Sequence, residues 1–245
     1  MFGYISINKA EMKFKDYLTG MKLSIPVFVG YFSVSFGFGA LAAAQGLRAL
    51  DATLISLTNL TSAGQFAGLT LILASAGLWE MILTQLVINS RYALMSLALS
   101  QRMGQCIGLL PRFLIAFFNT DEIFALAMSR QEALTAPYLL GLGTLPILGW
   151  TGGTLLGALA GSVLPEGLQT ALGVMLYGMF IAIVVPPAKK ERPVLICALL
   201  ALACSSLFAW VPALSAVSPG ISIVVCTVAA AAFCAWRFPI QEETP

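Results

Sequence analysis

Residues 193–236, PVLICALLALACSSLFAWVPALSAVSPGISIVVCTVAAAAFCAW, include no charged side chain. A transmembrane helix needs about 20 mostly apolar residues, so this stretch is long enough for two such helices. Prolines and a glycine within residues 212–220 supply a break between them. We therefore predict membrane helices over residues 193–211 and 219–236.

The rest of the chain has the same character. Of its 245 residues 59% are hydrophobic and 10% are charged, whereas about a quarter of the residues in a soluble domain are charged. Further membrane segments are predicted at 23–47, 53–76, 79–100, 113–129, 137–161 and 167–187. The predicted fold is an all-α polytopic membrane protein with about eight segments, seven or eight depending on whether some are broken or re-entrant.

The distribution of basic residues predicts the orientation, because cytoplasmic loops carry an excess of Lys and Arg. Eight crossings with a cytoplasmic N-terminus place nine basic residues inside and three outside. The tails at 1–22 and 239–245 are therefore expected in the cytoplasm, with one transmembrane transport domain at 23–238. The three outside are Arg48, Arg102 and Arg112. The last two argue against an external loop there, so a broken or re-entrant third segment remains an alternative.

When the sequence is compared with itself at an offset of 114 residues, several identical residues coincide between two halves, 23–130 and 137–238. This offset places Gly39 on Gly153, for example. Chance supplies part of this agreement in a chain so rich in Gly, Ala and Leu. Many transporters are built from internal repeats that meet at the substrate site. We predict such a repeat, which would be parallel for four spans per half and inverted for an odd number.

Three charged residues lie well away from the ends of predicted membrane segments: Arg91, Asp121 and Glu122. Ionisable side chains are costly in lipid and usually face a cavity or a partner. At about 1.5 Å per residue, Arg91 lies roughly 15 Å from either end of its segment, so it needs a nearby anion. Adjacent acids point about 100° apart on a helix, so one can pair with Arg91 while the other serves a proton or substrate. The alternative is an ion pair that only fixes helix packing.

A polar break interrupts the second predicted segment, around residues 58–65. Backbone groups exposed at a broken helix can hold the ammonium or carboxylate of a small zwitterion. The alternative is helix packing through small residues. The candidate substrate-binding residues in and near this break are Ser62, Ala63, Gly64, Gln65 and Phe66.

A repeated GxxxG face runs along the fifth predicted segment, as Gly149-x-x-x-Gly153-x-x-x-Gly157-x-x-x-Gly161. Glycines at this spacing let another helix backbone approach closely. We interpret this face as a packing surface, either within the chain or against a partner, and not as a substrate site.

Catalytic and metal-binding signatures are missing from the sequence. It has no histidine, its five cysteines form no CxxC pair, and GxSxG, HExxH and glycine-rich phosphate-loop motifs are lacking. We therefore expect no enzyme activity, no metal and no cofactor. The net charge of +2, without a basic run, also gives no reason to expect nucleic acid as a partner.

Three motifs, in order, resemble the large subunit of the AzlC-type branched-chain amino acid exporter family. TSAGQF at 61–66 is similar to an AGASQF-like motif, and NSRY at 89–92 is similar to an NLRH-like motif. TDEIFAL at 120–126 is similar to a TDE motif that precedes Phe-Ala-Leu. The resemblance covers roughly residues 20–236. It departs from the family in the permuted small residues of the first motif and in Tyr92, which replaces the histidine.

The resemblance implies export of valine, leucine, isoleucine and sometimes methionine across the bacterial inner membrane. It also implies proton coupling and a small AzlD-type membrane partner of about four helices. In this interpretation Asn89 and Arg91 join Ser62–Phe66 in binding substrate, while Asp121, or second Glu122, couples the proton. The alternatives are a passive channel or pore for small solutes, a transporter of another small zwitterion, and a structural subunit whose partner holds the site.

Overall fold

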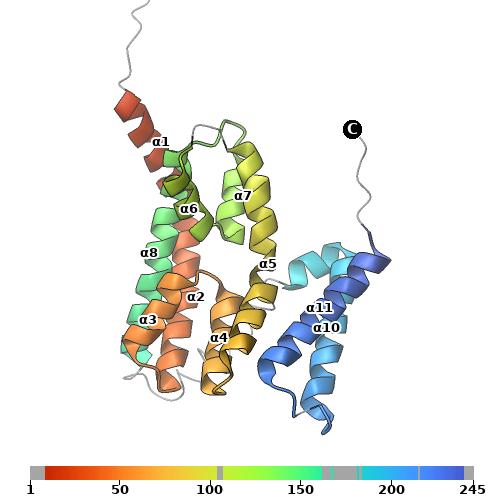
Figure 1. Cartoon of the computed structure of the whole chain (residues 1–245). Coiled ribbons are helices and arrows are strands. Elements are labelled where there is room, and N and C mark those ends of the chain that lie inside the picture. The colour runs from red at the N-terminus through yellow and green to blue at the C-terminus, as the bar shows by residue number, and fades with distance from the viewer. Residues whose placement is uncertain are drawn as a thin grey trace, which may run out of the picture. The chain divides into compact units, whose positions relative to one another are not determined.

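The computed structural model describes residues 9–103, 107–161, 167, 181, 184–214 and 216–239. Its helices are α1 (Lys9–Leu23), α2 (Ile25–Ala44), α3 (Ala49–Thr58), α4 (Ser62–Leu73), α5 (Leu78–Arg102), α6 (Leu109–Phe117), α7 (Asp121–Ser129), α8 (Ala136–Gly161), α10 (Arg192–Trp210) and α11 (Pro219–Arg237) (Figure 1). An isolated bridge between Met103 and Leu134 is the β-type pairing found in this part of the chain. The all-α prediction is confirmed.

Within the described residues, five helices are long and apolar enough to cross a membrane: α2, α5, α8, α10 and α11. They correspond to five of the eight predicted segments. The predicted segment at 53–76 contains two shorter helices, α3 and α4. The segment at 167–187 falls largely outside the described residues. Because α5 is continuous over 25 residues, the alternative of a broken third segment is wrong.

The chain forms two compact units. Unit 1 comprises residues 1–62 and 90–172, and unit 2 comprises residues 63–89 and 173–245. The boundary between them passes through α5, whose first part belongs to unit 2 and whose second part belongs to unit 1.

In unit 1, α2 and α8 run in the same direction, and the predicted GxxxG face lies between them. The face meets the α2 backbone at every fourth residue: Gly149 lies on Phe28, Gly153 on Phe32, Gly157 on Phe36 and Gly161 on Ala40. A methyl group built on Gly161 would sit 2.9 Å from the Ala40 Cα, closer than such atoms approach in real structures. The glycines are therefore required for this close packing.

Small hydroxyl side chains link the same helices. The buried Thr154 hydroxyl of α8 lies 2.6 Å from the Ser56 hydroxyl of α3 and donates to the Ser35 carbonyl of α2 at 3.3 Å. The Ser35 hydroxyl in turn lies 3.3 Å from the Gly149 carbonyl. Such interhelical hydrogen bonds stabilise helix contacts in an apolar environment. They fix α2, α3 and α8 of unit 1 as one packed group.

The predicted single segment at 113–129 is wrong in its course. The structure has two short helices there, α6 and α7, separated by the break at residues 118–120. Each is nine residues long. At about 1.5 Å per residue, neither helix can cross a membrane alone.

Contacts with α5 show that α6 and α7 form a hairpin that doubles back (Figure 1). Arg112, near the start of α6, lines a cavity together with the last turns of α5. Asn119, in the break, donates to the Ser96 hydroxyl one to two turns earlier on α5 at 3.1 Å. At the end of α7, the Met128 carbonyl accepts a 2.8 Å bond from Arg102, the last residue of α5. The chain therefore descends beside α5 in α6 and returns in α7, as a re-entrant hairpin does.

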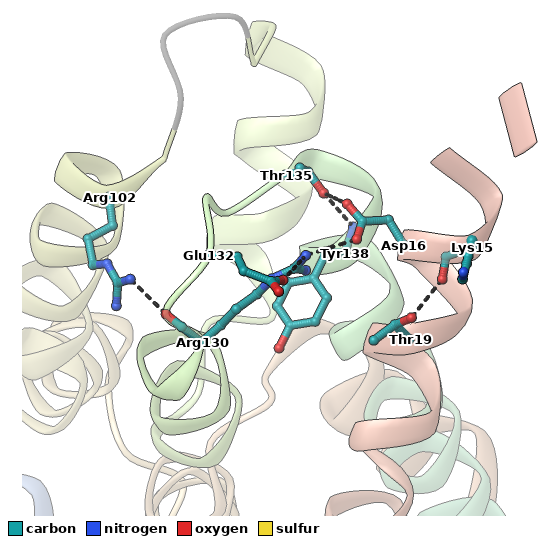
Figure 2. Close-up of polar contacts among 8 residues, drawn as sticks. All are labelled: Lys15, Asp16, Thr19, Arg102, Arg130, Glu132, Thr135 and Tyr138. Atoms are coloured by element: carbon teal, nitrogen blue, oxygen red, sulfur yellow. Dashed lines mark hydrogen bonds and ion pairs between the residues drawn. The ribbon is translucent and has the colours of Figure 1, made fainter. Parts of the chain in front are cut away.

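A polar cluster fastens α1 to the connection between α7 and α8 (Figure 2). Arg130 forms ion pairs with Asp16 at 3.0 Å and Glu132 at 2.9 Å, and its guanidinium lies 4.0 Å from the Tyr138 ring centroid. Thr135 donates a short hydrogen bond to Asp16. Burial lowers the pKa of Arg130, but the hydrogen bond and charge of Asp16, with a further contribution from Glu132, raise it more. The net pKa is raised, so Arg130 stays a cation.

This cluster corrects the predicted placement of Arg102 and Arg112 on the outside. Arg102 donates to the Arg130 carbonyl at 2.7 Å, and Arg130 pairs with Asp16 of α1. Arg112 lies beside the last turn of α5, which Arg102 ends. All three arginines are therefore at the end of unit 1 where α1 lies. The hairpin follows Arg102, so the error arose earlier in the chain: the sequence-based assignment counted 53–76 as one crossing, whereas the structure has two short helices there, α3 and α4.

We expect Arg130→Ala to loosen α1. The substitution removes two ion pairs and a cation–π contact from a side chain that is only 15% exposed, and it leaves Asp16 without its cation. Hydrogen bonds to charged groups contribute about 1.5–3 kcal/mol each. Trypsin should then cleave after Lys13 or Lys15 several-fold faster than in the unchanged protein. Arg48→Ala, which breaks an exposed pair with Asp51, is the control and should leave cleavage unchanged; equal rates for both variants would contradict a fastening role.

Unit 2 contains α4, the start of α5, α10 and α11. The Glu80 carboxylate of α5 accepts a 2.7 Å hydrogen bond from the backbone N–H of Gly220, in the first turn of α11. A carboxylate at this position balances the partial positive charge of a helix N-terminus. On α11, the Cys234 thiol lies 3.9 Å from the Pro193 carbonyl of α10.

Candidate functional site

The centre of the candidate site is an ion pair between Arg91 and Asp121. Arg91 lies on α5, about 20 Å from its first residue and about 17 Å from its last at 1.5 Å per residue. Asp121 is the first residue of α7, directly after the hairpin break. The structure thus places beside Arg91 the anion that a mid-membrane cation needs. The roles of both residues in transport remain predictions.

The pair is open. The Arg91 and Asp121 side chains are 48% and 45% exposed. The guanidinium also lies over the Tyr92 ring, 4.9 Å from its centroid, and donates to the Tyr92 hydroxyl at 3.3 Å. A positive and a negative group are therefore held side by side, and both are accessible to a ligand.

Glu122 has a different environment from Asp121, as expected for adjacent residues on a helix. The Tyr31 hydroxyl of α2 donates to the Glu122 carboxylate at 2.6 Å and lies equally close to the Thr120 hydroxyl. Thr120 is the N-cap residue of α7. Tyr31 therefore fixes the α7 N-terminus against α2, and Glu122 has a protein partner of its own.

The break between α3 and α4 lies near the break between α6 and α7, because both contact Tyr31 or its neighbour Trp150. The Trp150 indole of α8 donates to the Asn59 carbonyl at 3.2 Å, and its ring packs edge-on against Tyr31 with centroids 5.1 Å apart. Thr61, two residues after Asn59, is hydrogen-bonded to Tyr92. Two helix breaks and the middle of α5 therefore converge around Tyr31 and Trp150.

The structure has a helix break within the predicted stretch 58–65, but the candidate substrate-binding residues are not part of it. The non-helical residues are 59–61, while Ser62, Ala63, Gly64, Gln65 and Phe66 form the first turns of α4. The Asn59 side chain accepts the backbone N–H of Thr61 at 3.2 Å, which stabilises the non-helical turn. The break that exposes backbone groups therefore occupies residues 59–61 of the predicted stretch, directly before the candidate residues.

Of the predicted substrate-binding residues, Ala63, Gly64, Gln65, Phe66 and Asn89 lie in unit 2. Gln85 of α5 donates to the Gly64 carbonyl at 2.8 Å and accepts from the Asn89 amide at 3.1 Å. Gln65 and Phe66 are buried. Gln85 thus connects two predicted site residues, Gly64 and Asn89, a role that the sequence analysis missed.

Tyr31, Trp150 and Asn119 were also missed. Tyr and Trp carry a polar group that needs a partner when buried, so their presence inside predicted apolar segments was the available signal. Asn119 precedes the recognised TDE motif directly. In the part of the chain that the structure describes, no three Cys, Asp or Glu side chains gather as metal ligands would.

Comparison with known families identifies the protein class. The family model described as AzlC protein matches residues 26–164. The chain belongs to the AzlC family. The resemblance inferred from the three motifs is thereby confirmed, and the AzlC match includes every unit 1 residue of the candidate site, from Tyr31 to Trp150.

Individual relatives agree with this AzlC assignment. An uncharacterized membrane protein of Archaeoglobus fulgidus is 33% identical over 189 residues, covering 76% of this chain and 81% of its own. Inner membrane protein YgaZ of Escherichia coli is 29% identical over 201 residues, covering 78% and 82%. An uncharacterized membrane protein of Helicobacter pylori is 30% identical over 154 residues, covering 60% and 67%. No solved structure matches. The chain is therefore an AzlC-family membrane protein.

Proposed function

We propose that this protein exports branched-chain amino acids, valine, leucine and isoleucine and also methionine, across the bacterial cytoplasmic membrane. It would act as the large subunit of a proton-coupled, two-component transporter with a small AzlD-type membrane protein. The substrate class and the partner rest on the motif resemblance. The observation that carries the transport mechanism is the open Arg91–Asp121 pair at mid-helix, beside two helix breaks.

The geometry suits a zwitterion. An amino acid carries one carboxylate and one ammonium, and the pair offers one cation and one anion side by side. The substrate carboxylate would bind Arg91, whose planar guanidinium suits carboxylates. The ammonium would bind Asp121. The substrate would thus replace one ion pair by two.

The same arrangement provides the coupling. A proton on Asp121 removes the negative charge that holds the ammonium, so proton and substrate compete for one site. Competition of this kind produces exchange: a proton enters from the acidic outer side as the amino acid leaves. Glu122 is the second candidate for this proton, because it is bound by Tyr31 in the structure.

The distribution of charge supports a cytoplasmic position for the end of unit 1 where α1 lies. Arg102, Arg112 and Arg130 join the α1 lysines there, and Arg48 lies beyond the opposite end of α2. Basic residues concentrate on the cytoplasmic side of membrane proteins. The orientation proposed from the sequence therefore gains two arginines that had opposed it.

Efflux of valine from preloaded proteoliposomes tests the proposed function. Vesicles would contain the chain alone or with its small subunit, and the external buffer would be either one pH unit more acidic than the lumen or equal to it. We expect efflux that requires the small subunit and is accelerated several-fold by the inward proton gradient. Absence of efflux would contradict the substrate class, and efflux that ignores the gradient would indicate a channel.

A further inference from the structure

Unit 1 contains a cavity between α5 and α6, separate from the Arg91–Asp121 pair. Its volume is about 160 Å³. Leu99, Met103 and Ile115 form a buried apolar wall, each at most 9% exposed. Ser96 and Arg112 are among its polar residues. The cavity thus combines a buried apolar wall with one cation and is open on one side.

The volume limits what the cavity can hold. An apolar cavity of about 150 Å³ accommodates a molecule the size of benzene. Pockets for drug-sized ligands begin at about 300 Å³. One branched aliphatic side chain is therefore a suitable occupant by size.

Arg112 supplies a positive charge that forms no ion pair within the described part of the chain. Its Nε donates to the Ile107 carbonyl at 2.9 Å, and among the described residues no carboxylate lies within ion-pair distance of it. Arg48, Arg91 and Arg130 each pair with an acid. A cation beside an apolar cavity complements a ligand that has both an aliphatic group and an anionic group.

The inner end of the cavity adjoins the candidate site. Ser96, which lines the cavity, accepts the Asn119 side-chain N–H and lies about 7.5 Å along α5 from Arg91. Asn119 is 3% exposed, and its side-chain oxygen has no hydrogen-bond partner among the described residues. Thr120 and Asp121 follow it directly. A buried, unused acceptor therefore stands between the cavity and the ion pair.

We propose that this cavity is the loading site for an aliphatic amino acid at the α1 end of unit 1. Arg112 binds the carboxylate, the apolar wall covers the side chain, and the Asn119 oxygen accepts from the ammonium as the substrate moves toward Asp121. The inference rests on the proposed function. An anionic phospholipid presents the same chemistry, an acyl chain with an anionic headgroup, and the experiment distinguishes the two sources.

Ala116→Leu tests loading, because Ala116 lines the cavity and the larger side chain fills it. With the full chain and its small subunit, we expect the luminal leucine concentration for half-maximal efflux to rise about tenfold, with the maximal rate within twofold. Arg112→Gln should have the same effect. Gly152→Leu, which enters open space, and Arg48→Gln are the matched controls. Unchanged half-saturation in both test variants would overturn the loading site, whereas wild-type protein that exports no amino acid would overturn the proposed function instead.

Maleimide labelling of Ser100→Cys identifies the occupant. Ser100 lines the cavity, and its labelling is read at its own peptide by mass spectrometry. Leucine should slow labelling several-fold in nanodiscs of neutral lipid, and Ala116→Leu should abolish this protection. Protection by phosphatidylglycerol but not by leucine would assign the cavity to a lipid and overturn the proposal.

Discussion

Arg91→Gln and Asp121→Asn, each alone, are expected to reduce gradient-driven valine efflux by about 10- to 150-fold. Each variant removes a charged group that would bind one end of the zwitterion. A hydrogen bond to a charged group contributes about 1.5–3 kcal/mol, and about 1.4 kcal/mol corresponds to a factor of ten. Each variant also leaves its former partner without a counter-ion. Initial efflux rates from proteoliposomes at matched protein content measure the effect.

The double variant Arg91→Gln/Asp121→Asn separates a binding role from helix packing. If the pair only fixed packing, removing both charges would relieve the unpaired charge of the single variants, and efflux would recover. If the pair binds substrate, the double variant stays inactive although it folds and elutes as a single species. The matched control is Arg48→Gln/Asp51→Asn, an ion pair with side chains 80% and 38% exposed, which should leave efflux unchanged.

Substitutions of Asp121 and Glu122 test which of the two carboxylates couples transport to the proton gradient. Asp121→Asn should make any residual efflux independent of the pH gradient, because its side chain no longer takes up a proton. Glu122→Gln keeps hydrogen-bonding groups for Tyr31 and should retain the gradient response. The opposite pattern would move the coupling role to Glu122.

Part of the site could be predicted because an unpaired charge is costly inside a membrane. Arg91 had no route to either end of its segment, so a nearby anion followed from spacing alone, and only Asp121 or Glu122 was available. The choice between the two acids could not be made from sequence. It depends on Tyr31, which lies 91 residues from Glu122 in the chain and occupies that carboxylate.

The hairpin could not be predicted from composition. Residues 113–129 are apolar and long enough to cross a membrane, and the break at 118–120 contains neither Gly nor Pro. Hydropathy is the same for one crossing and for two half-length helices. Contacts of Asn119 with Ser96 and of Arg102 with the end of α7 decide the course.

Both helix breaks begin near an asparagine, and this was the available local signal. Asn59 bonds the backbone two residues on, and Asn119 bonds α5 with its amide. Asparagine side chains compete with helical backbone bonds, which favours turns. The prediction placed the first break around residues 58–65, and the small residues from Ser62 onward proved compatible with the start of α4.

Gly157→Leu is expected to disrupt unit 1. A Cβ at this position would collide with the Phe36 backbone carbonyl of α2, which cannot move aside as a flexible side chain could. The collision requires α2 and α8 to separate along a face where four glycines lie on four α2 residues. Overpacking costs about 1–3 kcal/mol where side chains can adjust. Because a backbone carbonyl cannot adjust in this way, we expect the free energy of unfolding to fall by about 3 kcal/mol or more. The thermal midpoint should fall by about 6–12 °C, because 1 kcal/mol corresponds to about 2–4 °C in a chain of this size.

Gly152→Leu provides the matched comparison on the same helix. A side chain there meets nothing within 4 Å, and replacing glycine with leucine raises helix propensity. The purified variant should therefore melt no lower than the unchanged protein, whereas Gly157→Leu should melt lower or elute as aggregate. Equal thermal midpoints for the two variants would mean that the GxxxG face tolerates side chains. The close approach of α2 and α8, on which the positions of Tyr31 and Trp150 depend, would then be wrong.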